Sequence, residues 1–190
     1  MSTPQADSGV RHRTRRAILD AALAVWARDW NASLGDIADQ AAVSRSTLHR
    51  YFPDRQALVE ATKERALEAF EEAGCDATSG SGTAREELDA LLRNAVAAGD
   101  AVIYLYSDPH RFGDEWAAED PGSDHTEMRE LVVRAQAEGA IAADVDPDWV
   151  ISVFYSLVYV GAESINAGTL PRHRAGEISS RTFFGGVAPG

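Results

Sequence analysis

The sequence of 190 residues contains a single cysteine, Cys75, which excludes an intramolecular disulfide and any multi-cysteine metal site. No run of eighteen or more apolar residues is present, so we expect no membrane-spanning helix and no membrane partner. Residues 1–9 lack the apolar segment of a signal peptide. Together these absences are typical of a protein of the reducing cytoplasm, and we predict a cytoplasmic location.

Catalytic signatures are also missing. The chain has no HExxH, no glycine-rich phosphate loop and no GxSxG, and its cysteine has no recognisable base partner. The five histidines are scattered, and the acidic neighbours of His110 and His125 are usual for solvent-facing loops. We therefore predict that the protein is not an enzyme and needs no cofactor and no metal.

Alternating strand patterns of useful length are absent, whereas apolar residues recur at three-to-four spacing through most of the chain. This periodicity predicts an all-α fold of about nine helices. The expected helices cover about residues 11–29, 33–40, 44–51, 54–73, 83–98, 101–106, 124–138, 147–166 and 175–187. Residues 74–82 form a Gly/Ser-rich break, and residues 108–122 are predicted to be irregular because they are rich in Pro, Gly and Asp.

Helix starts are marked by residues that accept hydrogen bonds from free backbone N–H groups. Ser33 is a predicted cap, with Asp36 three residues later completing a capping-box-like arrangement. Ser44 and Asp54 are predicted to cap the next two helices. Pro147 suits the first turn of a long helix, where its missing N–H costs nothing.

Positive charge is scarce overall, yet it is unevenly distributed. The net charge is −12, but residues 1–65 hold 10 Lys/Arg and 8 Asp/Glu, whereas residues 66–190 hold the other 8 Lys/Arg and 22 Asp/Glu. Local charge rather than total charge governs attraction to phosphate. The basic N-terminal end is therefore the expected partner of nucleic acid, and the acidic remainder is expected to repel it.

Two short helices joined by a tight turn, after a helix with a basic start, predict a helix-turn-helix that reads double-stranded DNA. The third helix offers hydroxyl, imidazole and guanidinium groups suited to phosphates and base edges. The predicted DNA-binding residues are Arg13, Ser33, Ser44, Arg45, Ser46, Thr47, His49, Arg50, Tyr51 and Arg55. Val43, Leu48 and Phe52 face inward and hold the helix on its support.

The run from Ser33 to Leu58, SLGDIADQAAVSRSTLHRYFPDRQAL, closely resembles the TetR/AcrR family of transcriptional regulators. The family pattern has Ile-Ala in the supporting helix, a Val-Ser turn and a Tyr-Phe pair followed by a polar cap and a basic residue. All these elements are present, with Arg55 where the family usually has Lys. Gly35 departs from the pattern, because the family prefers a larger residue and glycine weakens a short helix.

The predicted organisation is a disordered tail over residues 1–10, a three-helix DNA-binding domain over 11–55 and a helical effector-binding and dimerisation domain over 56–190. The helix after Pro147 is apolar on nearly every side and must be covered on every side, most simply by a second copy. The resemblance also implies a dimer. The predicted interface residues are Val150, Val153, Leu157, Val158, Gly161, Ile178 and Phe183.

Family members commonly hold a small effector between the middle helices and the long penultimate helix. Aromatic walls with a few hydroxyls favour a moderately apolar organic ligand. The candidate lining residues are Tyr104, Tyr106, Phe112, Trp116, Met128, Val132, Phe154, Tyr155 and Tyr159. An aromatic stripe at helical spacing belongs more often to an ordinary core than to a pocket.

The resulting hypothesis is a ligand-responsive repressor that binds a palindromic operator as a homodimer and is released by a small organic effector. Two alternatives remain open at this stage. One is a helical dimeric interaction protein that does not bind DNA, and the other is an activator with the same fold. The sequence names neither the effector nor the operator.

Overall fold

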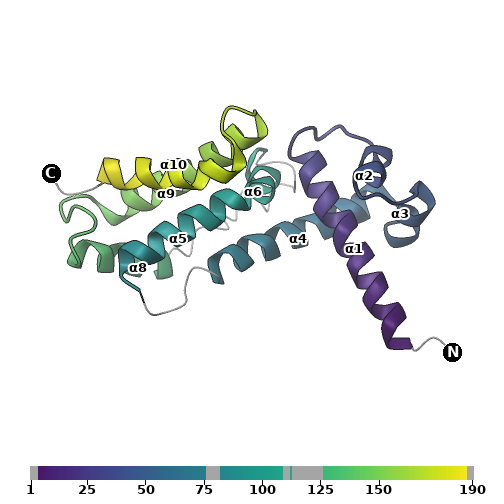
Figure 1. Ribbon diagram of the computed structural model, residues 1–190, viewed down its shortest axis with the longest axis horizontal. Coiled ribbons are helices and arrows are strands. Elements are labelled where there is room, and N and C mark those ends of the chain that lie inside the picture. Colours follow the sequence, from purple (N-terminus) through teal and green to yellow (C-terminus); the bar gives the residue numbers. More distant parts are fainter. Residues whose placement is uncertain (1–3, 76–81, 109–111, 113–125, 188–190) are drawn as a thin grey trace. The chain divides into compact units, whose positions relative to one another are not determined.

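The computed structural model describes residues 4–75, 82–108, 112 and 126–187. Within them it contains nine helices and no strand, which confirms the predicted all-α fold (Figure 1). The helices are α1 (Pro4–Trp26), α2 (Leu34–Gln40), α3 (Arg45–Tyr51), α4 (Arg55–Cys75), α5 (Ala84–Ala97), α6 (Gly99–Tyr106), α8 (Thr126–Ala137), α9 (Pro147–Asn166) and α10 (Arg172–Val187). None of the described helices is long and apolar enough to cross a membrane.

The first helix begins earlier than the sequence pattern predicted. We expected a disordered tail over residues 1–10, but α1 extends back to Pro4. Proline is tolerated there because the first helical N–H groups have no intrahelical acceptor. The tail predicted over residues 1–10 therefore overlaps with the start of this helix.

Two compact units make up the chain, residues 1–68 and residues 69–190. The expected boundary at residue 55 coincides with the start of α4, whereas the observed division falls inside this helix. The reason is that the first part of α4 packs with α1. The Nε of Arg65, a buried residue, donates to Oδ1 of Asp20 at 2.9 Å.

The core of the second unit is built around α9, which contacts α5, α6, α8 and α10. Figure 1 shows α5, α9 and α10 running alongside one another. Asp146 caps α9 by accepting from the N–H of Asp148, and Pro147 occupies the first turn as predicted. Phe154 and Phe183 are buried and meet edge to face with ring centroids 5.8 Å apart.

Small residues allow α9 to approach its neighbours within the same chain. A Cβ placed on Gly161 would lie 2.9 Å from Oγ of Ser179 on α10 and 3.1 Å from Val96 on α5. On the other side, a Cβ on Gly99 of α6 would lie 2.9 Å from the Cβ of Ala162. Real Cβ atoms essentially never come as close as 2.9 Å, so a larger residue at either glycine would force its neighbours to shift.

We expect Leu88→Ala on α5 to lower the free energy of unfolding by about 2–5 kcal/mol, because Leu88 is fully buried and its removal leaves a cavity. Urea unfolding followed by circular dichroism measures the change. Leu91→Ala on the same helix is the control, since Leu91 is only half-buried and should cost clearly less. Equal losses for the two variants would contradict the assignment of Leu88 to the core.

Candidate nucleic-acid interface and ligand cavity

The turn between α2 and α3 is set by a left-handed residue. Ala42 has φ of 53°, and the N–H of Val43 donates to the carbonyl of Ala38 at 2.9 Å. The N–H of Ala42 itself donates to the carbonyl of Asp39 at 3.1 Å. This pair of bonds is the Schellman arrangement that ends a helix, although glycine usually occupies the left-handed position. This turn connects α2 directly to α3 through a short segment, so no longer loop is needed.

Both predicted caps of the helix-turn-helix are present. The Ser33 hydroxyl accepts from the N–H of Asp36 at 3.2 Å, and the Asp36 carboxylate accepts from the N–H of Ser33 at 2.7 Å. The Ser44 hydroxyl accepts from the N–H of Thr47 at 3.1 Å. These bonds satisfy N–H groups that the helices themselves leave free, so α2 and α3 each begin at a defined residue.

Arg55 is engaged within its own unit. Its Nη1 donates to the carbonyl of Ala32 at 2.8 Å, and its Nη2 donates to the carbonyl of Trp30. The guanidinium carbon also lies 4.8 Å from the ring centroid of Trp26 and 5.2 Å from that of Trp30. The structure therefore places this predicted DNA contact against the loop between α1 and α2, where it fixes the loop.

The remaining predicted contacts lie on the surface of the first unit. Exposed side chains are those of Arg13, Ser33, Ser44, Arg45, Ser46, His49 and Arg50, whereas Thr47 and Tyr51 are half-buried. Leu48 and Phe52 are buried and anchor α3 as expected. The hydroxyl of Ser44 lies 2.9 Å from those of both Ser46 and Thr47, so these three form one polar cluster at the start of α3.

Arg45 lies across the first turn of α2. A Cβ added to Gly35 would come within 2.5 Å of Nη2 and 2.8 Å of Cζ of Arg45, so only glycine leaves room for the guanidinium in this position. Hydrogen bonds from Ser33 hold the pKa of Asp36 below its ordinary value, and the positive charge of Arg45 acts in the same direction. The departure from the family pattern at Gly35 thus has a structural consequence that the sequence did not reveal.

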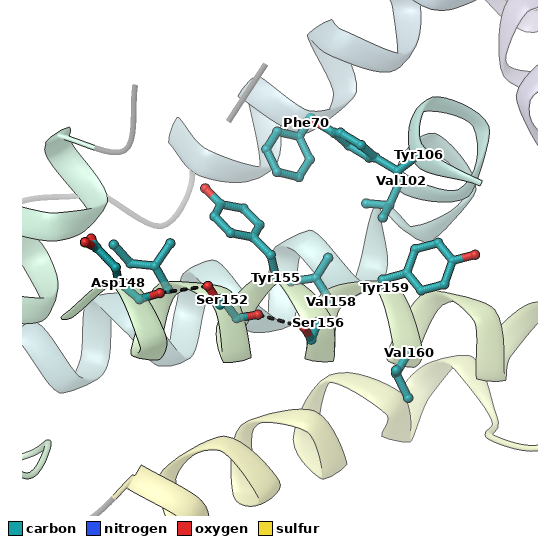
Figure 2. A pocket seen from close by; sticks show the side chains of 11 residues that line it. Phe70, Val102, Tyr106, Asp148, Ser152, Tyr155, Ser156, Val158, Tyr159 and Val160 are labelled. Atoms are coloured by element: carbon teal, nitrogen blue, oxygen red, sulfur yellow. Dashed lines mark hydrogen bonds between the residues drawn. The ribbon is translucent and has the colours of Figure 1, made fainter. Parts of the chain in front are cut away.

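A cavity of about 650 Å³ lies in the second unit, within the size range of small-molecule sites. Its walls come from α4, α6 and α9 and consist of four aromatic residues, four aliphatic residues, two serines and one aspartate. They are Phe70, Val102, Tyr106, Asp148, Ile151, Ser152, Tyr155, Ser156, Val158, Tyr159 and Val160. Figure 2 shows the ring of Tyr155 pointing from α9 toward Phe70.

The predicted pocket residues divide between this cavity and the core. Tyr106, Tyr155 and Tyr159 line the cavity. Outside its wall are the buried Tyr104, Val132 and Phe154, together with the half-buried Met128 and Phe112. Trp116 lies outside the described residues. Phe70 and the two serines were missed because helical spacing alone does not separate a cavity wall from an exposed face.

The predicted dimer residues are mostly interior to one chain. Val150, Val158, Gly161 and Phe183 are buried, whereas Val153, Leu157 and Ile178 are half-buried. The large apolar side chains that α9 exposes are instead Trp149 (63%), Val160 (55%) and Tyr159 (36%). A helix that is apolar on nearly every side is thus covered largely by its own chain.

Among the described residues, no group of three or more His, Cys, Asp or Glu side chains is arranged to hold a metal ion. The geometry instead combines an exposed polar helix on a trihelical unit with an organic-sized cavity in a separate helical unit. This combination defines the class of one-component regulators, in which one chain carries both a reading unit and a sensing unit.

Comparison with known proteins gives the family. Residues 18–62 match the model of the bacterial regulatory proteins of the tetR family. The chain is 37% identical over 196 residues to the HTH-type transcriptional repressor LfrR of Mycolicibacterium smegmatis, covering 98% of this chain and 97% of that protein. The chain therefore belongs to the TetR family of transcriptional regulators, as its motif predicted, and is not an enzyme.

Solved structures agree with this assignment. The crystal structure of LfrR from Mycobacterium smegmatis in complex with proflavine matches with a TM-score of 0.69 and 32% identity, covering 93% of this chain and 98% of that one. The ketosteroid regulator KstR2 of Mycobacterium tuberculosis matches with a TM-score of 0.72 at 19% identity, covering 93% and 95%. The second similarity concerns the fold alone.

We expect Gly35→Ala to displace the Arg45 guanidinium and to weaken binding to duplex DNA by about 3- to 10-fold. The slope of log affinity against log salt should become shallower by about one contact. Thermal stability should not fall, because the displaced group is the end of a flexible side chain and alanine is favoured over glycine in helices by about 0.5–1 kcal/mol.

Arg45→Ala provides the control for this prediction. In the Arg45→Ala background, Gly35→Ala should cause no further loss, since its effect passes through the same guanidinium. Unchanged DNA affinity in the single variant, or an equal loss in both backgrounds, would contradict the role of Gly35.

The lowered pKa of Asp36 predicts a pH-dependent contribution to stability. A carboxyl whose folded-state pKa is depressed stabilises the fold above its unfolded pKa and loses this effect as the pH falls through the folded value. The difference in unfolding free energy between the wild type and Asp36→Asn should therefore shrink below about pH 4. Urea unfolding across this range measures it, and a difference independent of pH would show that the ionised cap does not matter.

Proposed function

We propose that the protein is a repressor that binds a palindromic operator as a homodimer and releases it when a small organic effector occupies the cavity. The observation that supports this most directly is the exposed polar face of α3 on an intact helix-turn-helix, in a chain 37% identical to a repressor. We assign DNA reading to residues 11–55 and sensing and dimerisation to residues 56–190.

The DNA-reading role rests on α3 and its supports. Ser46, His49 and Arg50 are exposed, while Leu48 is buried and holds the opposite face of the helix. A helix supported in this way enters the major groove with its polar side chains at base edges, and its neighbours contact phosphates. We assign Arg50 to a base or phosphate and Arg45 to a phosphate beside the start of α2.

Dimerisation explains the exposed apolar groups of α9. Trp149 and Val160 remain largely exposed in the single chain, and the half-buried Val153, Leu157 and Ile178 add apolar surface on α9 and α10. We propose that a second copy covers them. A twofold pair of α3 helices would then read half-sites about 34–36 Å apart, which requires a palindromic operator.

The effector is proposed to be a small aromatic compound. Phe70, Tyr106, Tyr155 and Tyr159 supply flat apolar surfaces, and the cavity volume is suited to a molecule of drug size. The solved structure of LfrR in complex with proflavine shows a tricyclic aromatic ligand bound to a relative. An aromatic ligand is thus compatible with both observations.

Release is proposed to pass through α4. This helix runs without a break from Arg55, which fixes the loop before α2, to the region of Phe70 in the cavity wall. A ligand that touches Phe70 therefore acts on a helix continuous with the reading unit. A preference of about 3 kcal/mol for the released conformation would lower operator affinity by somewhat more than a hundredfold.

The test is selection of bound sites from a random duplex pool by the purified full chain, followed by affinity measurements at two salt concentrations. We expect enrichment of a palindrome whose binding weakens as salt rises. Arg50→Ala should weaken it by about 5- to 150-fold, as expected for loss of a bidentate or phosphate contact worth about 1–3 kcal/mol.

Arg181→Ala is the matched control, because Arg181 is an exposed arginine on α10 outside the reading unit. It should leave operator affinity unchanged. Absence of any enriched sequence, with or without aromatic compounds in the mixture, would favour the alternative of a helical interaction protein. A palindrome bound as tightly by Arg50→Ala as by the wild type would remove α3 from the proposed interface.

A further inference from the structure

The polar groups of the cavity include a row on α9. Asp148, Ser152 and Ser156 all line the cavity and stand four residues apart, so they lie on the same side of the helix about 6 Å from one another along its axis. Figure 2 shows them following one another along α9. We call these three residues the α9 row.

Both hydroxyls of the α9 row have already used their hydrogen as a donor. Oγ of Ser152 donates to the carbonyl of Asp148 at 2.8 Å, and Oγ of Ser156 donates to the carbonyl of Ser152 at 2.7 Å. A carbonyl can only accept, so the serine must be the donor in each bond. What remains on each oxygen is acceptor capacity, and a ligand beside it must supply the N–H or O–H.

Asp148, at the end of the row, is also an acceptor. Its Oδ1 accepts from Nη1 of Arg129 on α8. An ionised carboxylate accepts up to about four hydrogen bonds, so this ion pair leaves further acceptor sites. The ion pair with Arg129 offsets part of the carboxylate's charge, and the remaining acceptor sites favour a ligand that donates N–H groups.

The rest of the wall consists of four aromatic and four aliphatic side chains. Tyr155 on α9 and Phe70 on α4 face each other across the space in Figure 2, and Tyr106 stands beside Phe70. Aromatic faces stabilise flat ring systems by stacking. A planar ring lying between these side chains places groups on its edge next to the α9 row.

We propose that the cavity recognises planar aromatic amines, whose amino N–H groups donate to the α9 row. Ser152 and Ser156 are then specificity-determining residues that select N–H donors at equal ligand charge. This inference rests on the proposed effector role of the cavity and adds the chemical class of the ligand.

A pair of dyes separates hydrogen bonding from charge. Proflavine is a tricyclic cation with two amino groups, and acridine orange has the same ring and charge with both amino groups fully methylated. Fluorescence titration of the full chain measures the dissociation constant of each dye. We expect Ser152→Ala and Ser156→Ala each to weaken proflavine binding by about 3- to 10-fold, as expected for one lost hydrogen bond, and to change acridine orange binding by less than about twofold.

Ser164→Ala on the same helix is the matched control, because Ser164 does not line the cavity, and it should leave both dyes unaffected. Equal losses for both dyes in the Ser152 and Ser156 variants would overturn the acceptor role, since a packing change does not distinguish N–H from N–CH₃. No loss for either dye would overturn it as well.

Failure of the proposed effector cavity gives a different result. In that case the wild-type chain binds neither dye, or binds both with affinities that Tyr155→Ala leaves unchanged. A third result separates the two proposals. If Tyr155→Ala weakens dye binding but the serine variants change the affinities of both dyes equally, the cavity is a ligand site and the α9 row does not determine its selectivity.

Discussion

The second unit depends on the burial of one helix. α9 is apolar along most of its length, and it is covered by α5, α6, α8 and α10 of the same chain. Gly161 and Gly99 leave no room for a Cβ and so let the neighbouring helices approach closely. Only part of the surface of such a helix remains available for binding a ligand or a second copy. That part carries the cavity wall and the exposed Trp149 and Val160.

The part of α9 that its own chain leaves uncovered serves two proposed tasks. The cavity side of α9 bears Tyr155 and the α9 row, while Trp149 and Val160 present apolar surface to solvent. Val160 belongs to both sets, so a second copy seated on α9 would lie next to the ligand. Ligand binding and dimer geometry would then be coupled through one rigid element, without a separate signalling path.

In the first unit, several arginines make structural contacts within the chain in addition to supplying positive charge. Arg55 bonds two carbonyls of the loop before α2 and stacks on Trp26 and Trp30. Arg65 joins α4 to α1 through Asp20. Arg45 lies over Gly35, in contact with a helix whose cap carboxylate it helps to keep ionised. A count of basic residues therefore overstates the charge that is free to meet phosphate.

The sequence alone predicted the nine helices that the structure describes, the caps of α2 and α3, and the family, although α1 begins earlier than predicted. These features depend on local periodicity, on short-range bonds such as Ser33–Asp36, and on a motif of contiguous residues. It did not separate the cavity-lining Tyr155 from the core residue Phe154, nor identify Val150 and Phe183 as interior to one chain. Both distinctions depend on which helix covers which face. Which helix covers which face depends on contacts between residues far apart in sequence, so only the tertiary structure decides it. The apolar pattern of one helix is the same whether a face packs against the core, lines a cavity or meets a second copy.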